Sequence, residues 1–213
     1  QFGPTSPFSI DLWVKLSANW TPGTNITLVT KHGAGSNQFG YDLLVHPETG
    51  KFSFILDNYG VSQNRVDGTT TPLANTWYHV TGTTDGSTIR LYVNGLQEGS
   101  TARTVGGNAA STPFEIGHSP NALGGPNPSP VARLQDEVEV FNRELTLTEI
   151  QDIYNAGSAG KCICTPAPSG MTLWHTANGT TNDAAGSNNG TLQNGATYAA
   201  GKVAQAYSFD GVD

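Results

Sequence analysis

The stretch WYHVTGTTDGSTIRLYVNG, residues 77–95, decides the fold of this chain. An Asp-Gly turn inside it separates two strand-like segments, Trp77–Thr83 and Thr88–Val93. Asn94-Gly95 is the strongest two-residue signal for a β-hairpin, so Leu96–Ser100 is predicted to return as a third strand. The stretch therefore predicts consecutive antiparallel strands joined by tight turns.

The same succession of strands and turns extends over residues 1–145. Phe8–Leu16 alternates apolar and polar residues with a period of two, as a half-buried strand does. A Pro-Glu-Thr-Gly turn at residues 47–50 joins two further apolar segments into a hairpin. The other expected strands are Thr27–Lys31, Gly40–His46, Lys51–Leu56, Pro113–Gly117 and Leu134–Phe141. Many short strands with almost no helix predict an all-β sandwich or barrel.

One short helix is expected after these strands. Thr146 and Glu149 form a capping box, in which each side chain accepts the backbone N–H of the other residue. Gly157 suits the left-handed conformation that ends a helix. The face expected to pack on the sandwich consists of Leu147, Ile150 and Ile153 or Tyr154.

The composition is typical of an extracellular module built from strands and turns. Of the 213 residues, 26 are Gly and 12 are Pro, while charged residues make up only 13%. The net charge of −7 argues against nucleic acids and anionic membranes, which proteins bind through Lys and Arg. No segment approaches the roughly 18 apolar residues of a membrane span, and no signal peptide is visible at Gln1. We therefore expect no nucleic acid partner and no membrane insertion.

Residues 157–170 are predicted to be a linker, because Gly, Ser, Ala and Pro dominate them. The linker holds both cysteines, Cys162 and Cys164. Two cysteines are too few for a zinc site, and their spacing does not match a redox pair. The alternatives are a local disulfide between them or bonds to another chain, and both fit an oxidising compartment. The expected location is extracellular or at the cell surface.

Parts of the chain resemble a known family. The 77–95 stretch resembles the central hairpin of bacterial laminin G-like domains, which belong to the concanavalin A-like lectin/glucanase superfamily. Phe114–Gly117 and Asp136–Leu145 resemble the closing strands of that family. Ala132 departs from a glycine that is usual there, which puts the local bulge in doubt but not the fold. The resemblance implies a concanavalin A-like antiparallel β-sandwich, or jelly roll, with one short helix.

Residues 171–213 resemble the beginning of the same kind of domain. Asn188–Tyr198 and Gly201–Asp213 look like the first strands of the family, and residues 1–156 lack such strands. The chain is therefore expected to be one period of a tandem repeat, cut out of phase. Its body is residues 1–156, its linker is 157–170, and residues 171–213 form a completing segment.

The completing segment has three possible destinations. It would fold back and pair with the body of its own chain, or it would complete the body of a neighbouring chain. The third alternative is that the chain is part of a longer tandem array of identical or similar repeats. Tyr207 and Phe209 are the expected slot-filling side chains, since a buried large apolar side chain contributes roughly 1.5–3 kcal/mol. The segment is therefore expected to pair with a body rather than to hang free.

The resemblance also raises the question of catalysis, because the superfamily includes laminarinase-type glycanases. Retaining glycanases hold two carboxyl groups about 5–5.5 Å apart, and the spacing of Glu137 and Glu139 on one strand would allow that. The third carboxylate of the glycanase pattern is absent, since positions 141 and 142 are Phe and Asn. The chain is therefore expected not to be an enzyme.

A structural calcium ion is a further expectation from the resemblance, because superfamily members often use one to join an early loop to a late strand. The matching carboxylates are those of Asp183 and Asp136. Asp210 is a weaker candidate, because an Asp-Gly pair is also a simple turn. The alternative is that these carboxylates cap turns or accept backbone hydrogen bonds.

Sugar binding requires exposed aromatic faces, and Trp20, Tyr59 and Trp174 are the rings outside clear core positions. We expect a non-catalytic extracellular repeat of a surface protein or fibre. It would assemble with similar repeats by β-strand completion and mediate adhesion, with glycans as further partners. The alternative is a carbohydrate-binding module of an exported glycan-active protein.

Overall fold

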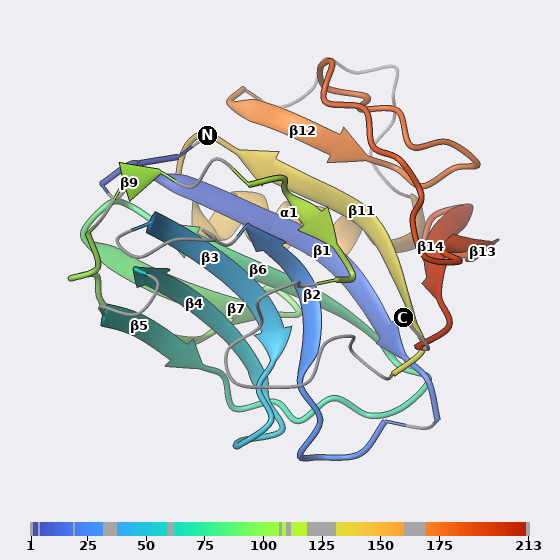
Figure 1. The fold of residues 1–213 in the computed structure, drawn as a ribbon, viewed down its shortest axis with the longest axis horizontal. Coiled ribbons are helices and arrows are strands. Elements are labelled where there is room, and N and C mark those ends of the chain that lie inside the picture. The colour runs from blue at the N-terminus through green and yellow to red at the C-terminus, as the bar shows by residue number, and fades with distance from the viewer. Residues whose placement is uncertain are drawn as a thin grey trace.

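Two sheets pack face to face in the computed structural model of the chain (Figure 1). The structure describes residues 2–3, 5–18, 20–31, 38–58, 62–106, 108–109, 112–118, 131–159 and 169–211. The larger sheet has the strand order β13-β14-β11-β1-β6-β7-β8, and β12 also pairs with β11. Its strands are β1 (Phe8–Leu16), β6 (Trp77–Thr84), β7 (Thr88–Val93), β8 (Leu96–Ala102), β11 (Arg133–Phe141), β12 (Met171–His175), β13 (Thr197–Ala200) and β14 (Gln205–Phe209).

The smaller sheet has the order β10-β2-β3-β4-β5, with the short β9 parallel to β3. Its strands are β2 (Ile26–Lys31), β3 (Gln38–Val45), β4 (Phe52–Asn58), β5 (Ser62–Asp67), β9 (Asn108–Ala109) and β10 (Glu115–Ile116). The predicted hairpins are confirmed, since β3 pairs with β4, and β7 pairs with both β6 and β8. The predicted sandwich is likewise confirmed. The strand β5 was not predicted.

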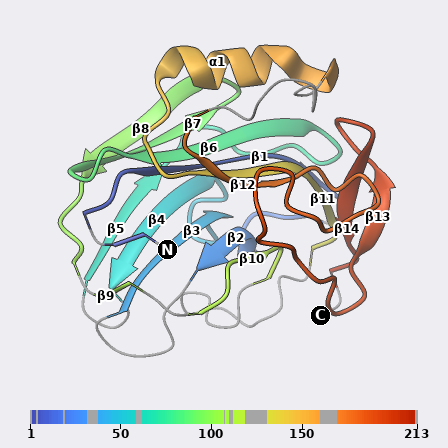
Figure 2. The ribbon, with the colours of Figure 1, turned by 90° about the horizontal axis from the view of Figure 1, so that it is seen from above.

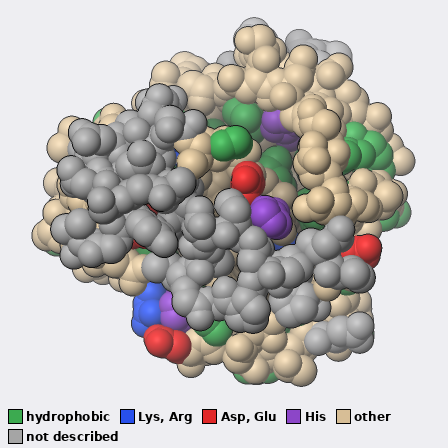
Figure 3. Space-filling model, viewed as in Figure 1, with side chains coloured by type: hydrophobic (Ala, Val, Ile, Leu, Met, Phe, Trp, Pro, Cys, Tyr) green, Lys and Arg blue, Asp and Glu red, His purple; other side chains and the backbone are tan. Residues whose placement is uncertain are grey.

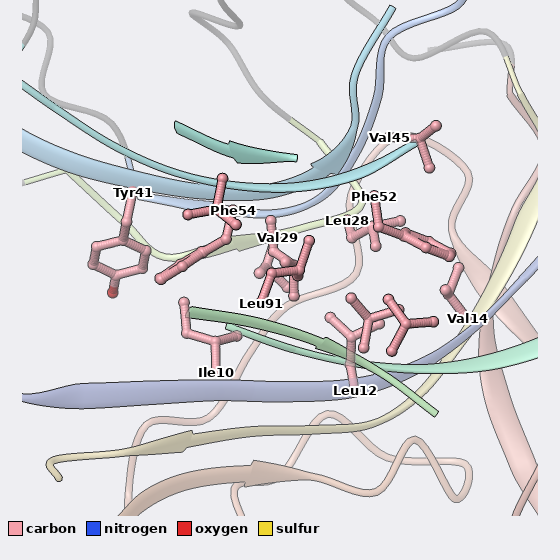
Figure 4. Close-up of a cluster of buried hydrophobic side chains, with 14 of the residues drawn as sticks. Ile10, Leu12, Val14, Leu28, Val29, Tyr41, Val45, Phe52, Phe54 and Leu91 are labelled. Atoms are coloured by element: carbon pink, nitrogen blue, oxygen red, sulfur yellow. The ribbon is translucent and has the colours of Figure 1, made fainter. Parts of the chain in front are cut away.

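The core lies between the two sheets, where their inward side chains interdigitate (Figure 4). Ile10, Leu12 and Val14 point inward from β1 and meet Phe52 and Phe54 of β4. These side chains follow the alternation of their strands, because successive residues of a strand point to opposite faces. Burial of this apolar surface is the main favourable contribution to folding.

The outer face of the larger sheet is covered by the helix α1 (Leu147–Ala156), as Figure 2 shows. The predicted capping box is present, and Gly157 ends the helix with a φ of 55°. Ile150 is buried as expected, but Leu147 is 47% exposed, so the packed face is narrower than predicted. Because the helix covers the sheet, the outward residues Asp11 and Trp13 of β1 are also buried.

The described part of the C-terminal segment, residues 171–211, lies against the edge of the body of the same chain. Its strand β12 pairs with the Val138–Phe141 half of β11, and β14 pairs with Arg133–Gln135 at the other half. The strands β13 and β14 form a hairpin at the end of the sheet, drawn in red in Figure 1. The assignment of this segment as the missing first strands of a repeat stays a prediction. No helix among the described residues is long and apolar enough to cross a membrane.

Candidate functional site

A cavity of about 930 Å³ lies at the seam between the body and the C-terminal segment. One wall comes from the body and includes Phe2, Lys31, Tyr41, Phe114, Glu115 and His118. The other wall comes from the C-terminal segment and includes Thr172, His175, Thr181, residues 188–194, Tyr207 and Phe209. Figure 3 shows a hollow on this face of the molecule, where hydrophobic, acidic and histidine side chains gather.

The body wall is an aromatic cluster at the open edge of the sandwich. The ring centroid of Tyr41 lies 6.2 Å from that of Phe2 and 6.5 Å from that of Phe114. The strand β10 places Phe114 here, because Glu115 and Ile116 pair with β2 directly after it. Tyr41 is itself buried, so the ring surfaces that this wall offers are those of the partly exposed Phe2 and Phe114.

The opposite wall is a loop organised by Asp183. Its Oδ1 accepts the backbone N–H groups of Trp174 and Ala185, both at 2.9 Å, and its Oδ2 accepts the N–H of Asn188 at 3.1 Å. Burial opposes ionisation of this carboxyl, but the N–H donors hold its pKa below the ordinary value. The charged carboxylate therefore fixes the loop that carries the amide side chains of residues 188–194.

His175 and Tyr207 form the buried end of the C-terminal wall. The Nδ1 atom of His175 lies 3.2 Å from the hydroxyl oxygen of Tyr207. Burial lowers the pKa of His175 below its ordinary value of 6.5, so its ring is uncharged at neutral pH. Burial also raises the pKa of Tyr207 well above its ordinary value, so its hydroxyl stays protonated.

Phe209 seats the C-terminal segment on the body. A methyl group at Gly117, which has a φ of 77°, would lie only 2.5 Å from the ring of Phe209, so the close packing here requires glycine. The guanidinium carbon of Arg133 lies 4.9 Å from the centroid of the same ring. Arg133 also donates hydrogen bonds to the carbonyl oxygens of Val131 and Gly117, and burial lowers its pKa to about 10. Phe209, a predicted slot-filling residue, thus packs against the body of its own chain.

The predicted calcium carboxylates lie in separate hydrogen-bond sets. Asp136 accepts the N–H groups of Lys202 and Val203 at 2.8 and 2.7 Å, and burial raises its pKa to about 6. Asp183 accepts the loop N–H groups described above, and Asp210 is an exposed residue. The described residues contain no group of three or more His, Cys, Asp or Glu side chains arranged for a metal.

Asp136 and Asp183, as placed, do not fit a calcium ion, because N–H donors already occupy the carboxylate oxygens that would bind it. Calcium binding stays a prediction, and unfolding temperatures measured with millimolar calcium and with EDTA test it.

The two predicted sugar-binding rings that the structure describes, Trp20 and Trp174, do not line the cavity. Trp174 is 3% exposed, and its indole N–H donates to the Glu137 carboxylate at 2.8 Å. Trp20 is half-buried and packs against the core. Tyr59, Cys162 and Cys164 lie outside the described residues.

The carboxylate pair considered for catalysis lies on the other face of the sheet, beneath α1. Glu137 sits at a bulge with a φ of 50°, and Glu139 is 1% exposed. The space beside them, lined by Trp13, Ile153 and Ala156 among others, is about 10 Å³. Such a space holds about one water molecule and no sugar ring.

The residues that line the cavity were missed at the sequence level, apart from Tyr207 and Phe209. The sequence signal that marks them is the polar run Asn188–Asn194, NNGTLQN, which is rich in amides. Nothing local in the sequence shows that this run faces the aromatic wall around Tyr41. That juxtaposition depends on the pairing of β12 and β14 with β11.

Comparisons with known proteins agree with this architecture. The laminin G family model described as the concanavalin A-like lectin/glucanases superfamily matches residues 1–151. No curated protein sequence matches the chain.

Solved structures share the fold at low sequence identity. One is a "putative carbohydrate binding protein" from Bacteroides ovatus, with 19% identity, a TM-score of 0.60, and coverage of 95% of this chain and 52% of that one. A second is the binding domain of botulinum neurotoxin serotype D, with 18% identity, a TM-score of 0.53, and coverage of 71% and 36%. A third is the binding domain of Paraclostridial Mosquitocidal Protein 1, with 16% identity, a TM-score of 0.55, and coverage of 73% and 38%. The chain thus spans about half or less of the length of each.

Proposed function

Because the chain belongs to the concanavalin A-like lectin/glucanases superfamily, we propose that it is a non-catalytic extracellular domain that binds glycans in the seam cavity and thereby mediates adhesion. The observation that carries the proposal is the cavity itself. Its volume of about 930 Å³ lies within the range of ligand pockets, and aromatic rings stand on both of its walls. Structural neighbours described as a carbohydrate-binding protein and as the binding domain of a neurotoxin are consistent with a binding role.

The chemistry of the cavity suits a sugar. A sugar ring has an apolar face that packs on an aromatic ring and hydroxyl groups that exchange hydrogen bonds with amides. Phe2 and Phe114 supply partly exposed rings from the body, and Phe209 supplies one from the C-terminal segment. Amide side chains such as Gln193 and Asn194 supply paired donors and acceptors at the lip.

A glycan array followed by titration calorimetry tests the proposal. The variant Gln193→Ala removes an exposed cavity amide, and we expect it to weaken glycan binding at least about fivefold, since a net hydrogen bond contributes roughly 1 kcal/mol. The matched control, Gln97→Ala, removes an exposed amide on β8 that does not line the cavity. Equal affinities for the wild-type protein and both variants would show that the cavity is not the site.

We also propose that the C-terminal segment can complete a neighbouring body, so that repeats assemble by strand exchange. The observation that favours this candidate is that β12 and β14, which follow the predicted linker of residues 157–170, pair with β11. An identical segment of another copy would offer the same pairing groups. Cys162 and Cys164 of the predicted linker would then either form a disulfide with each other or form disulfides that join two chains.

Catalysis at Glu137 and Glu139 is not part of the proposal. Both carboxyl groups are buried beneath α1, away from the seam cavity, and Glu137 is engaged by the indole of Trp174. We expect no release of reducing ends from laminarin by the wild-type protein. Hydrolysis that is abolished by Glu137→Gln or Glu139→Gln would contradict this assignment.

A further inference from the structure

The polar groups of the seam cavity are predominantly uncharged. The lip carries the amides of Asn188, Asn189, Gln193 and Asn194, and the hydroxyls of Thr181 and Thr191 lie beside them. Amides and hydroxyls both donate and accept hydrogen bonds, which matches the hydroxyl groups of a sugar. Because these groups are uncharged, they do not compensate for the free-energy cost of removing water from an ionised ligand.

Cationic side chains are few among the described residues of the cavity, and the lysine there is already hydrogen-bonded. The Nζ of Lys31 donates to the carbonyl oxygen of Thr112, and burial lowers the pKa of this lysine. Burial likewise lowers the pKa of His175, so this ring carries no charge at neutral pH. No arginine occurs among the described residues that line the cavity, although arginine is the usual partner of a carboxylate or phosphate.

The carboxylate of Glu115 adds an acidic group to the body wall. Its Oε2 lies 3.0 Å from Nδ1 of His118, and both side chains are partly exposed at the cavity. The whole chain carries a net charge of −7, which repels anions before they reach the site. An anionic ligand would therefore meet the Glu115 carboxylate on one wall, while the lysine among the described lining residues, Lys31, already donates to the carbonyl oxygen of Thr112.

We infer that the seam cavity selects uncharged oligosaccharides and excludes glycans that carry uronic acid, sialic acid or sulfate groups. This inference rests on the proposed function, because it assigns the ligand class of the same site. The partly exposed rings of Phe2, Phe114 and Phe209 hold the apolar faces of a neutral sugar, and the lip amides hold its hydroxyl groups. The cavity is large for a single sugar ring, so the ligand spans more than one sugar unit.

The test is an array of neutral and acidic glycans probed with the full chain, with Gln193→Ala and with Gln97→Ala. The expected result is binding to neutral oligosaccharides only, weakened by Gln193→Ala and unchanged by Gln97→Ala. Raising sodium chloride from about 0.05 to about 0.5 M should change the affinity less than about twofold, because no ion pair is screened.

Other outcomes separate the two hypotheses. Binding to acidic glycans that is weakened by Gln193→Ala, or a steep fall of affinity with salt, would overturn the charge inference and leave the proposed function intact. If no glycan bound, or if Gln193→Ala left the glycan affinity unchanged, the proposed function and the inference would both be overturned.

Discussion

Single residues set how closely the parts of this sandwich approach each other. Gly82 of β6 lies beneath the ring of Phe54 from the opposite sheet, and Gly117 lies beneath the ring of Phe209 from the C-terminal segment. At both positions a glycine replaces a side chain that would collide with an aromatic ring. Closely packed interiors transmit such collisions, because side chains have few empty spaces to move into.

The substitution Gly82→Ala should therefore destabilise the fold. Its added methyl group would lie 2.6 Å from ring atoms of Phe54, so the ring or the strand must shift. We expect a loss of about 1–3 kcal/mol in the free energy of unfolding, as for other overpacked cores. Chemical denaturation monitored by tryptophan fluorescence measures it.

The control for this substitution is Gly106→Ala, where the added methyl group meets no atom within 4 Å and φ is not positive. It should be neutral or slightly stabilising. Equal losses in the two variants would mean that the contact with Phe54 is not the cause.

At the scale of elements, the C-terminal strands are held to β11 by polar contacts at both ends. In β12, the indole N–H of Trp174 donates to Glu137 of β11. Just before β14, the backbone N–H groups of Lys202 and Val203 donate to Asp136 of β11. His175 of β12 is a titratable side chain that contacts the hydroxyl of Tyr207 in β14, and the Asp183 charge lies near it. The docking of these strands should therefore depend on pH.

The sign of this dependence follows from the lowered pKa of His175. Below pH 6.5 the unfolded chain binds a proton at this ring more readily than the folded protein, so the free energy of unfolding falls as the pH drops toward the lowered pKa. Above pH 6.5 the effect is absent. The raised pKa of Asp136, about 6, acts in the opposite direction, since protonation of that carboxyl favours the folded state below pH 6.

The variant His175→Gln isolates the histidine contribution from that of Asp136. We expect the unfolding temperature of the wild-type protein, relative to the variant, to fall between pH 7.5 and pH 5.5. The control is Gln97→Ala on β8, which removes no titratable group and should leave the pH dependence of the unfolding temperature unchanged. If the unfolding temperature of His175→Gln changed with pH in parallel with that of the wild-type protein, His175 would not be the source of the pH dependence.

At the scale of the whole molecule, the seam cavity exists only while the C-terminal segment is docked. Its walls come from two regions that are far apart in sequence, so a ligand that touches both binds only the docked state. Ligand binding and docking are therefore linked equilibria, in which each stabilises the other.

The variant Asp136→Ala tests this linkage, because Asp136 holds Lys202 and Val203 but does not line the cavity. We expect faster hydrogen exchange at the amides of Ala206–Phe209 and a matching loss of glycan affinity. An oligosaccharide found by the array should slow this exchange in the wild-type protein. The control, Asp152→Ala on the exposed side of α1, should change neither quantity. Faster hydrogen exchange in Asp136→Ala with an unchanged glycan affinity would contradict the linkage.

Shortening the linker tests strand exchange. Deletion of residues 160–167 should prevent the C-terminal segment from reaching its own body, so that it completes a second copy instead. We expect dimers or larger species by light scattering, while the same residues replaced by a Gly/Ser sequence of equal length give a monomer. A shortened chain that remains a folded monomer would exclude exchange through this segment.

The sequence by itself determined the elements whose signals are local. The turns at Asp85-Gly86 and Asn94-Gly95 set the central hairpins, and the capping box at Thr146 set the start of α1. Such signals act between residues a few positions apart, so they survive without knowledge of the rest of the chain. The family and its sandwich followed from these elements.

Only the tertiary structure decided which faces are buried and where a ligand can enter. Trp174 appeared available to a sugar in the sequence, yet pairing of β12 with β11 buries it against Glu137. The outward residues of β1, such as Trp13, are buried because α1 returns over the sheet. The cavity arises in the same way, because its aromatic wall and its amide wall meet only through long-range strand pairing, which no local sequence pattern encodes.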